Sequence, residues 1–179
     1  DHISKKGAVQ TAVRIGSATI NKRHADYPGL KYLNVLLGGY FGSRLMKNLR
    51  EEKGYTYGIH SIVSSFDKSG LWMISTEAGR ENSTKAVEEI KKEIDHLIKN
   101  KVPADEMEVV GNYMAGELVR SFDGPIAIAE SFKSAWEFGL DLTYFSTMMH
   151  TIRTITSEEV IRLANTYYTI DDLYEITAG

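Results

Sequence analysis

The most constraining feature of this sequence is a charged helical segment that passes into a strand across a single glycine. The stretch from Leu36 to Ser65 reads LLGGYFGSRLMKNLREEKGYTYGIHSIVSS. Ser43 is a good N-cap residue for a helix over 44–53, and Gly54 stands where a left-handed C-cap is favoured. From Tyr55 the pattern changes to a period of two, which is typical of a β-strand. The sequence therefore predicts a helix and a strand joined by a tight turn.

The alternation after Gly54 assigns the side chains of the predicted strand to two faces. One face is expected to carry Tyr55, Tyr57, Ile59, Ser61 and Val63, and the other Thr56, Gly58, His60 and Ile62. The short turn also fixes the offset between Arg50 in the helix and Tyr57 in the strand.

The rest of the chain predicts the order strand, helix, strand, strand, helices, strand. A half-buried strand is expected over 8–21, and Asp26 followed by Tyr27-Pro28 predicts a helix start with the acid as cap. The later elements are expected as a strand over 70–78, helices from Asn82 onward broken at Pro103 and at 123–125, helices over 126–138 and 143–153, a capping box at Thr156 and a strand over 172–178. This order indicates an α+β fold in which a mixed, mainly antiparallel sheet carries helices on one face.

Length and composition favour one domain over 1–179. The chain has 179 residues, of which 42% are apolar, and a net charge of −3 with no cysteine. Disulfides and thiolate chemistry are thus excluded, while the compartment, cytoplasm or periplasm in a bacterium, stays open. No apolar run approaches the roughly 18 residues of a membrane span. Because the chain lacks an initial Met and soon enters a strand, we expect it to be a fragment of a longer protein.

The residue spacing gives no metal site and no nucleophile in this chain. The five histidines are each more than twenty residues from the next, so no His-x-x-Glu-His occurs. Glu93 and His96 have the Glu-x-x-His spacing of di-iron bundles, which need two copies. No Gly-x-Ser-x-Gly motif exists.

One stretch partly matches an RNA-binding signature. Residues 53–60 resemble the Lys-Gly-aromatic pattern of RNA-recognition strands, but Thr56, Gly58 and His60 depart from it and the net charge is negative. RNA binding is therefore a remote alternative, and we predict no nucleic-acid partner.

Arg50 and Tyr57 are the remaining candidates for chemistry. Arginine offers a planar fork of donors to carbonyl or carboxylate oxygens, and a protonated tyrosine hydroxyl can donate to a developing oxyanion. Residue types alone favour the plain alternative, in which Arg50 pairs with a surface acid and Tyr57 packs on its neighbours.

The same stretch resembles the non-zinc half of the pitrilysin-type zinc metallopeptidases, the family of insulysin and the mitochondrial processing peptidase. The matching residues are His24-Ala25-Asp26, Leu37-Gly38-Gly39, Ser43-Arg44-Leu45, Leu49-Arg50-Glu51, Lys53-Gly54 and Tyr57. The resemblance implies two homologous halves around a chamber, with the zinc ligands on the other half.

Carried over to this sequence, the resemblance implies roles for named residues. Tyr57 would donate to the oxyanion and Arg50 would hold a backbone carbonyl of a peptide substrate. The loop of Gly38, Gly39, Gly42 and Ser43 resembles a substrate-binding loop of the processing peptidases, although it is shorter here. Zinc is expected on the partner half, in the same polypeptide or on another subunit, so this fragment alone is expected to be inactive. A relative that serves only as a scaffold subunit is the alternative.

Overall fold

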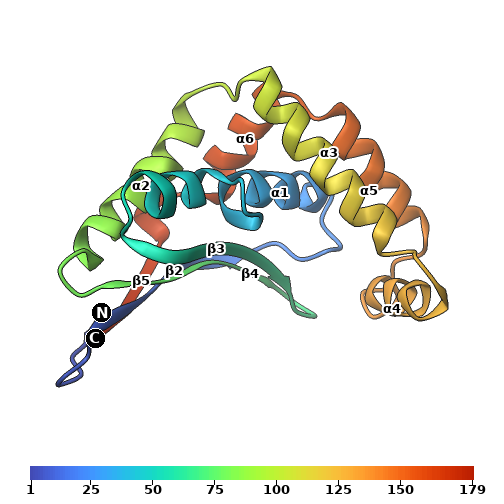
Figure 1. Ribbon diagram of the computed structural model, residues 1–179. Helices are drawn as coiled ribbons and strands as arrows, with labels where there is room; N and C mark the ends of the chain where they lie inside the picture. The colour runs from blue at the N-terminus through green and yellow to red at the C-terminus, as the bar shows by residue number, and fades with distance from the viewer.

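The computed structural model describes residues 1–179, and its centre is one five-stranded sheet (Figure 1). The strands lie in the order β1-β5-β2-β4-β3, and only the pair β1–β5 is parallel. Their bounds are β1 His2–Ile3, β2 Gln10–Thr19, β3 Thr56–Ser65, β4 Gly70–Gly79 and β5 Tyr174–Ala178. The predicted mixed, mainly antiparallel sheet is confirmed.

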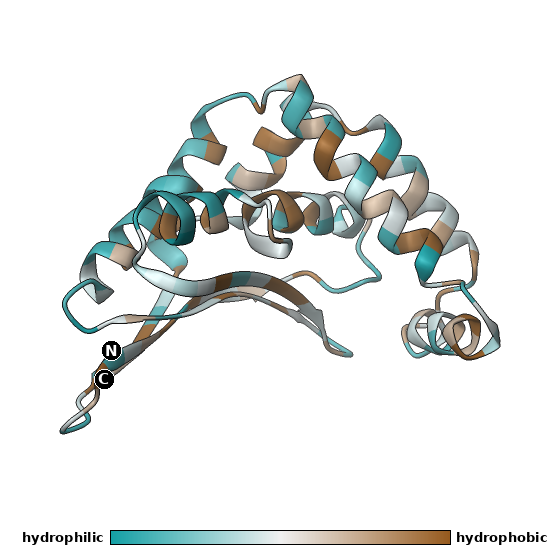
Figure 2. Cartoon of the chain, in the orientation of Figure 1, coloured by the Kyte–Doolittle hydropathy of each residue, from teal (hydrophilic) through white to brown (hydrophobic).

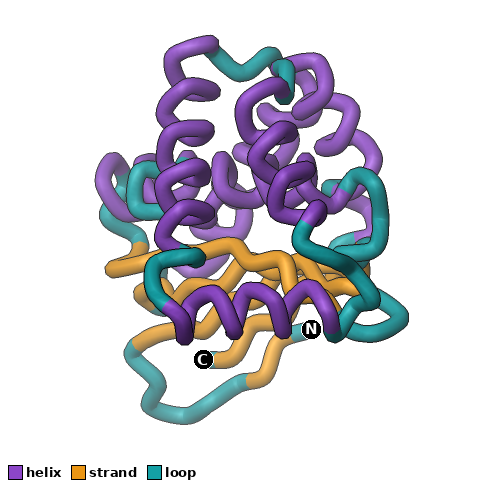
Figure 3. Tube along the Cα trace, turned by 90° about the vertical axis from the view of Figure 1, so that its right-hand side faces the viewer, coloured by secondary structure: helices purple, strands orange, loops and turns teal.

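The main helical layer lies on one face of this sheet, α4 stands apart beyond one end of it, and the other face is not covered by helices (Figures 1 and 3). We call the uncovered side the open face. The helices are α1 Tyr27–Asn34, α2 Ser83–Lys99, α3 Ala104–Arg120, α4 Pro125–Trp136, α5 Thr143–Thr154 and α6 Ser157–Tyr167, with a 3₁₀ turn at Ile170–Asp172. The predicted α+β layer arrangement is confirmed.

The hydrophobic core fills the space between the sheet and the helices. Alternate residues of the strands, such as Val13, Ile15 and Ile74, point into it and are almost fully buried. Helix α2 adds a stripe of apolar residues at three- and four-residue spacing, and its buried residues are Ala86, Val87, Ile90, Ile94 and Leu97. Figure 2 shows apolar segments on the strands and on the helices above them.

A buried polar chain ties helix α1 to the sheet. Ser61 Oγ donates to Asn34 Oδ1 at 2.6 Å and accepts from Trp72 Nε1 at 2.9 Å, while Asn34 Nδ2 donates to Ser61 O at 3.0 Å. All of these polar groups are therefore paired, as burial requires. The network holds β3 in register beneath α1.

Two predicted helix caps are wrong. Asp26 stands before α1 with helical backbone angles and makes no capping bond, because its carboxylate accepts from Arg162 and Tyr167 instead. Ser43 is buried and its Oγ has no partner. The cap at Thr156 is confirmed, since its Oγ1 accepts from Glu159 N at 3.3 Å.

The N-terminal strand β1 and the C-terminal strand β5 lie next to each other at one edge of the sheet. Strand β5 lies between β1 and β2, pairing with β1 through His2–Thr177 and Ile3–Ala178. The predicted last strand begins at Tyr174, two residues later than the pattern indicates, because residues 170–172 form the 3₁₀ turn. Strand β1 has only two residues and was not predicted.

No helix in the structure combines the length and apolar character needed to cross a bilayer.

Candidate functional site

The turn between the helical segment after Ser43 and strand β3 is stabilised by backbone hydrogen bonds that span five or six residues. The helical segment after Ser43 takes π-helical form over Met46–Glu52. Lys53 N donates to Asn48 O at 3.0 Å and Tyr55 N donates to Leu49 O at 2.9 Å, across Gly54 with a φ of +63°. A left-handed φ suits glycine because it has no Cβ. The predicted glycine stop is confirmed, and the last helical turn is fixed to the start of β3.

Strand β3 carries a bulge at Tyr57. Its pairing with β4 passes from Thr56–Ala78 to Ile59–Thr76, so Tyr57 and Gly58 stand opposite Glu77 alone. A β-bulge of this kind bends the strand and re-aims side chains. Tyr57 is consequently 90% exposed, whereas Ile59 is buried. The expectation that these two side chains share one face is wrong, and Thr56 takes the buried position instead.

Arg50 lies at the end of the π-helical segment and is half-buried. No acidic side chain lies within ion-pair distance of its guanidinium, whose carbon lies 4.6 Å from the centroid of the Phe41 ring. The plain alternative of a surface ion pair therefore does not describe this arginine. Its donors are available to a ligand.

Arg50 and Tyr57 line the same hollow, of about 400 Å³, which we call the Arg50 hollow. Its other lining residues include Gln10, Glu77, Glu81 and Asn82. A second hollow of about 360 Å³ adjoins it and shares Gln10, Thr56, Tyr57 and Glu77 with it. We call this one the Thr76 hollow, and its further residues are Arg14, Gly58, His60, Ser75 and Thr76. Tyr57 thus stands at the boundary of two polar concavities.

The glycine-rich loop contacts the site through an aromatic residue. The loop predicted over Gly38 to Ser43 is shorter than expected, because Gly38 and Gly39 end a π-helical segment over Val35–Gly39. Gly38 and Ser43 are buried, Gly39 and Gly42 are half-buried, and none of the four lines either hollow. A Cβ on Gly38 would lie 2.8 Å from Ser61 Cβ and 3.0 Å from Ser61 N, so this glycine allows close packing on β3. Phe41, at the exposed tip, supports Arg50. Sequence reasoning missed Phe41, although an exposed aromatic in a glycine-rich loop is a usable signal.

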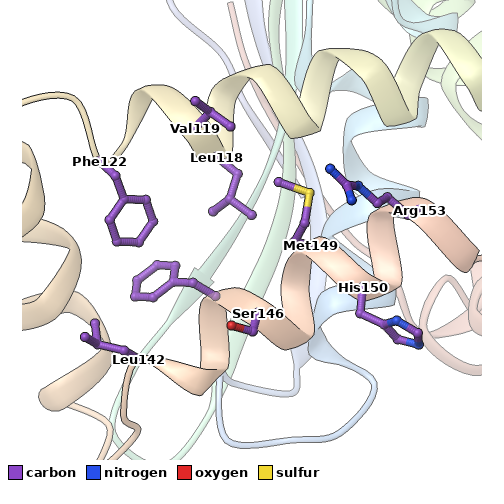
Figure 4. Close-up of a pocket in the computed structure, with 9 residues that line it drawn as sticks. Leu118, Val119, Phe122, Leu142, Ser146, Met149, His150 and Arg153 are labelled. Atoms are coloured by element: carbon purple, nitrogen blue, oxygen red, sulfur yellow. The ribbon is translucent and has the colours of Figure 1, made fainter.

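Another hollow lies away from these residues. Figure 4 shows an apolar pocket of about 580 Å³ between α3 and α5, lined by Leu118, Phe122, Met149 and neighbouring residues. It contains none of the predicted site residues. No group of three or more His, Asp or Glu side chains is arranged to hold a metal ion anywhere in the chain, so zinc does not fit the residues present here.

Residues 2–112 match the family model described as the peptidase M16 inactive domain. This chain belongs to the M16 peptidase family. The match covers more than half of the chain and includes the whole stretch from Leu36 to Ser65. The predicted resemblance to the non-zinc half of pitrilysin-type peptidases is therefore confirmed.

Relatives of this M16 domain carry names of two kinds. It is 29% identical over 119 residues to the uncharacterized zinc protease YmxG of Bacillus subtilis, covering 66% of this chain and 29% of that protein. It is 24% identical over 149 residues to the non-peptidase homolog YmxG of Helicobacter pylori, covering 83% of this chain and 34% of that protein. The chain thus spans about a third of the length of these relatives.

A solved structure of the family has the same fold. The peptidase M16 inactive domain from Pseudomonas fluorescens superposes with a TM-score of 0.91 at 26% identity, covering 99% of this chain and 42% of that one. The M16 domain described here therefore corresponds to one part of a longer chain in that protein.

Proposed function

We propose that this M16 domain is the substrate-binding, non-zinc half of a zinc metalloendopeptidase. Arg50 holds a backbone carbonyl of the peptide and Tyr57 donates to the oxyanion that forms at the scissile carbonyl. One observation carries the proposal: two side chains with unengaged donors, one half-buried and one fully projecting, line one polar hollow of about 400 Å³.

The chemistry of the two side chains fits these roles. Zinc, which the homologous half in the same polypeptide or on another subunit would hold, would supply a Lewis acid to polarise the carbonyl and activate water. Neither an arginine nor a tyrosine acts as a base at neutral pH, so both serve as donors. Tyr57 projects from the open face, where a facing domain can reach it, and Phe41 limits the movement of Arg50.

The loop of Gly38, Gly39, Gly42 and Ser43 has a smaller part in this proposal. Direct contact of these residues with substrate remains a prediction. Their present support is indirect, because the loop carries Phe41 to the guanidinium of Arg50.

The test is made in the full-length protein with its zinc-bearing half, assayed on quenched fluorescent peptides. Tyr57→Phe is expected to lower kcat at least tenfold with little change in KM, since loss of one oxyanion donor typically lowers kcat by about 10²–10³. Arg50→Ala is expected to raise KM more than it lowers kcat. Tyr174→Phe, an exposed tyrosine of β5, is the matched control. Unchanged turnover of Tyr57→Phe contradicts the assigned role.

A scaffold subunit without peptidase activity is the second candidate, because one relative is named a non-peptidase homolog. The two candidates differ in one measurement. If the full-length protein, loaded with zinc, hydrolyses no member of a broad peptide library, the scaffold function replaces the peptidase function.

A further inference from the structure

We propose that Thr56 and Thr76 are positioning residues that hold Tyr57 toward the open face by fixing the bulge of β3. This inference rests on the proposed role of Tyr57. Neither threonine contacts the substrate in it. Their hydroxyls act on the backbone from which the tyrosine projects, and we call this pair the threonine clasp.

The clasp is a compact set of short contacts at the bulge. Thr56 Oγ1 lies 2.8 Å from both Gly58 O and Glu77 O, and it accepts from Gly58 N at 3.1 Å. Thr76 Oγ1 lies 2.9 Å from both Thr56 Oγ1 and Gly58 O. A hydroxyl donates one proton and accepts up to two, so the two hydroxyls together serve three backbone groups of the irregular pair.

Burial of the two threonine side chains increases the contribution of these hydrogen bonds to stability. Thr56 is 8% exposed and Thr76 is 4% exposed, so water has little access to the hydroxyls. A bulge removes residues from the regular ladder, and buried backbone groups left without partners are strongly unfavourable. The clasp supplies partners for Gly58 and Glu77, and the bulged pairing is thereby the favoured one.

The bulge decides the direction of the tyrosine. Side chains of a strand alternate between faces, so a shift of one residue moves a side chain to the other face. In a regular continuation from Ile59, the side chain of residue 57 points to the same face as Ile59, into the core. Without the clasp, the phenol loses its fixed projection into the two hollows.

Arg50 provides an internal comparison. Its position depends on the bond from Tyr55 N to Leu49 O, which lies before the bulge, and on Phe41. Weakening the clasp therefore affects the oxyanion donor more than the carbonyl donor. The expected kinetic signature is a lower kcat with an almost unchanged KM.

The kinetic experiment uses the full-length protein with its zinc-bearing half and the quenched peptides. Thr76→Val, which keeps the shape and removes the hydroxyl, is expected to lower kcat at least fivefold with KM within twofold. Thr76→Ser, which keeps the hydroxyl, is expected to retain most of the wild-type kcat. Thr11→Val is the matched control, because Thr11 is buried on neighbouring β2 and is outside the clasp. In a Tyr57→Phe background, Thr76→Val is expected to have no further effect.

A second measurement is independent of turnover. Hydrogen exchange of the Gly58 amide, which donates to Thr56 Oγ1, is expected to rise at least tenfold in Thr56→Val and to stay unchanged in Thr11→Val. If Thr76→Val lowers kcat by the same factor in the wild-type and in the Tyr57→Phe background, the proposed clasp is overturned. An unchanged exchange rate of the Gly58 amide in Thr56→Val also overturns it. If Tyr57→Phe has no effect on kcat while Thr56→Val raises the exchange rate of the Gly58 amide, the clasp stands and the proposed function is rejected.

Discussion

The guanidinium carbon of Arg50 lies 4.6 Å from the centroid of the Phe41 ring, so a residue of the turn before Ser43 contacts a residue near the end of the π-helical segment. A cation over an aromatic face is attracted by the ring quadrupole, by about 0.5–1 kcal/mol at exposed sites. The contact limits the directions that the guanidinium can take before substrate arrives. It also gives the loop a physical connection to the site.

The first prediction concerns this contact. Phe41→Ala in the full-length protein is expected to raise KM about two- to fivefold and to leave kcat unchanged, because about 0.5–1 kcal/mol of preorganisation is lost. Steady-state peptide hydrolysis measures both parameters. Phe66→Ala, an exposed phenylalanine in the β3–β4 turn, is the control and is expected to change neither. Equal KM values for the two variants contradict a supporting role for Phe41.

The second prediction concerns the bidentate ion pair between Arg44 and Glu106. The pair joins the helical residue that follows Ser43 to α3, with N–O distances of 2.8 and 2.7 Å and side chains 11% and 23% exposed. Arg44→Ala is expected to lower the free energy of unfolding by about 2 kcal/mol, because Glu106 is left partly buried without its partner.

The control for this ion pair is Lys101, whose bond to Glu158 is largely exposed. Lys101→Ala is expected to lower the free energy of unfolding much less than Arg44→Ala does, because an exposed ion pair is well solvated in both states. Urea denaturation of both variants provides the comparison. Similar losses in the two would show that burial does not strengthen the Arg44 pair.

The third prediction compares two buried tyrosines. Tyr168 is fully buried, stacks on Trp72 with ring centroids 3.9 Å apart and has a hydroxyl without a partner. Burial raises the pKa of this phenol well above its usual value. Tyr168→Phe removes an unpaired buried hydroxyl and is expected to raise the free energy of unfolding by about 1 kcal/mol.

The matched variant is Tyr32→Phe. Tyr32 donates to Met107 O at 2.5 Å, so removal of its hydroxyl is expected to lower the free energy of unfolding by about 1 kcal/mol. Thermal or urea unfolding of the two variants gives the sign of each change. Effects of the same sign contradict the assignment.

The fourth prediction concerns stability at low pH. Hydrogen bonds from Arg162, together with one from Tyr167, hold the pKa of Asp26 below its usual value. A carboxyl with a lowered folded pKa stabilises the protein fully above its unfolded pKa of about 3.9, and this contribution is lost as the pH falls through the folded pKa. We expect the free energy of unfolding of wild type to fall between about pH 4 and pH 2.

Asp26→Asn checks that assignment. This variant is expected to be less stable than wild type near pH 6 by about 1 kcal/mol, with the difference shrinking below pH 4. Urea denaturation from pH 2 to pH 6 measures the difference. A constant difference over this range would assign the acid sensitivity to other carboxyl groups.

Periodicity, together with breaks at Pro103 and at 123–125, placed the helices and long strands, because their apolar faces meet one core. The stripe of α2 at three and four residues and the alternation of β2 both describe a buried face directly. Short elements were harder. Strand β1 has two residues, too few for a period, and Asp26 and Ser43 are common cap residues whose side chains have other environments here.

The site was partly predictable for a different reason. Arg50 and Tyr57 followed from a family pattern, whereas the direction of Tyr57 did not follow from the local alternation. The bulge that turns Tyr57 outward depends on Thr76, which is about twenty residues further along the chain on another strand. A contact between residues so far apart in the sequence cannot be predicted from the local pattern. The Phe41 ring under Arg50 is likewise a tertiary contact.

The position of β5 has a consequence for the order of folding. Strand β2 forms ten residue pairs with β4 but also needs β5 on its other side, from residues more than 150 positions later in the chain. Contacts between such distant segments are slow to form. During synthesis on the ribosome, β2 would expose an unpaired edge until residues 174–178 have emerged. A truncation before Tyr174 is therefore a direct route to edge-to-edge aggregation of this domain.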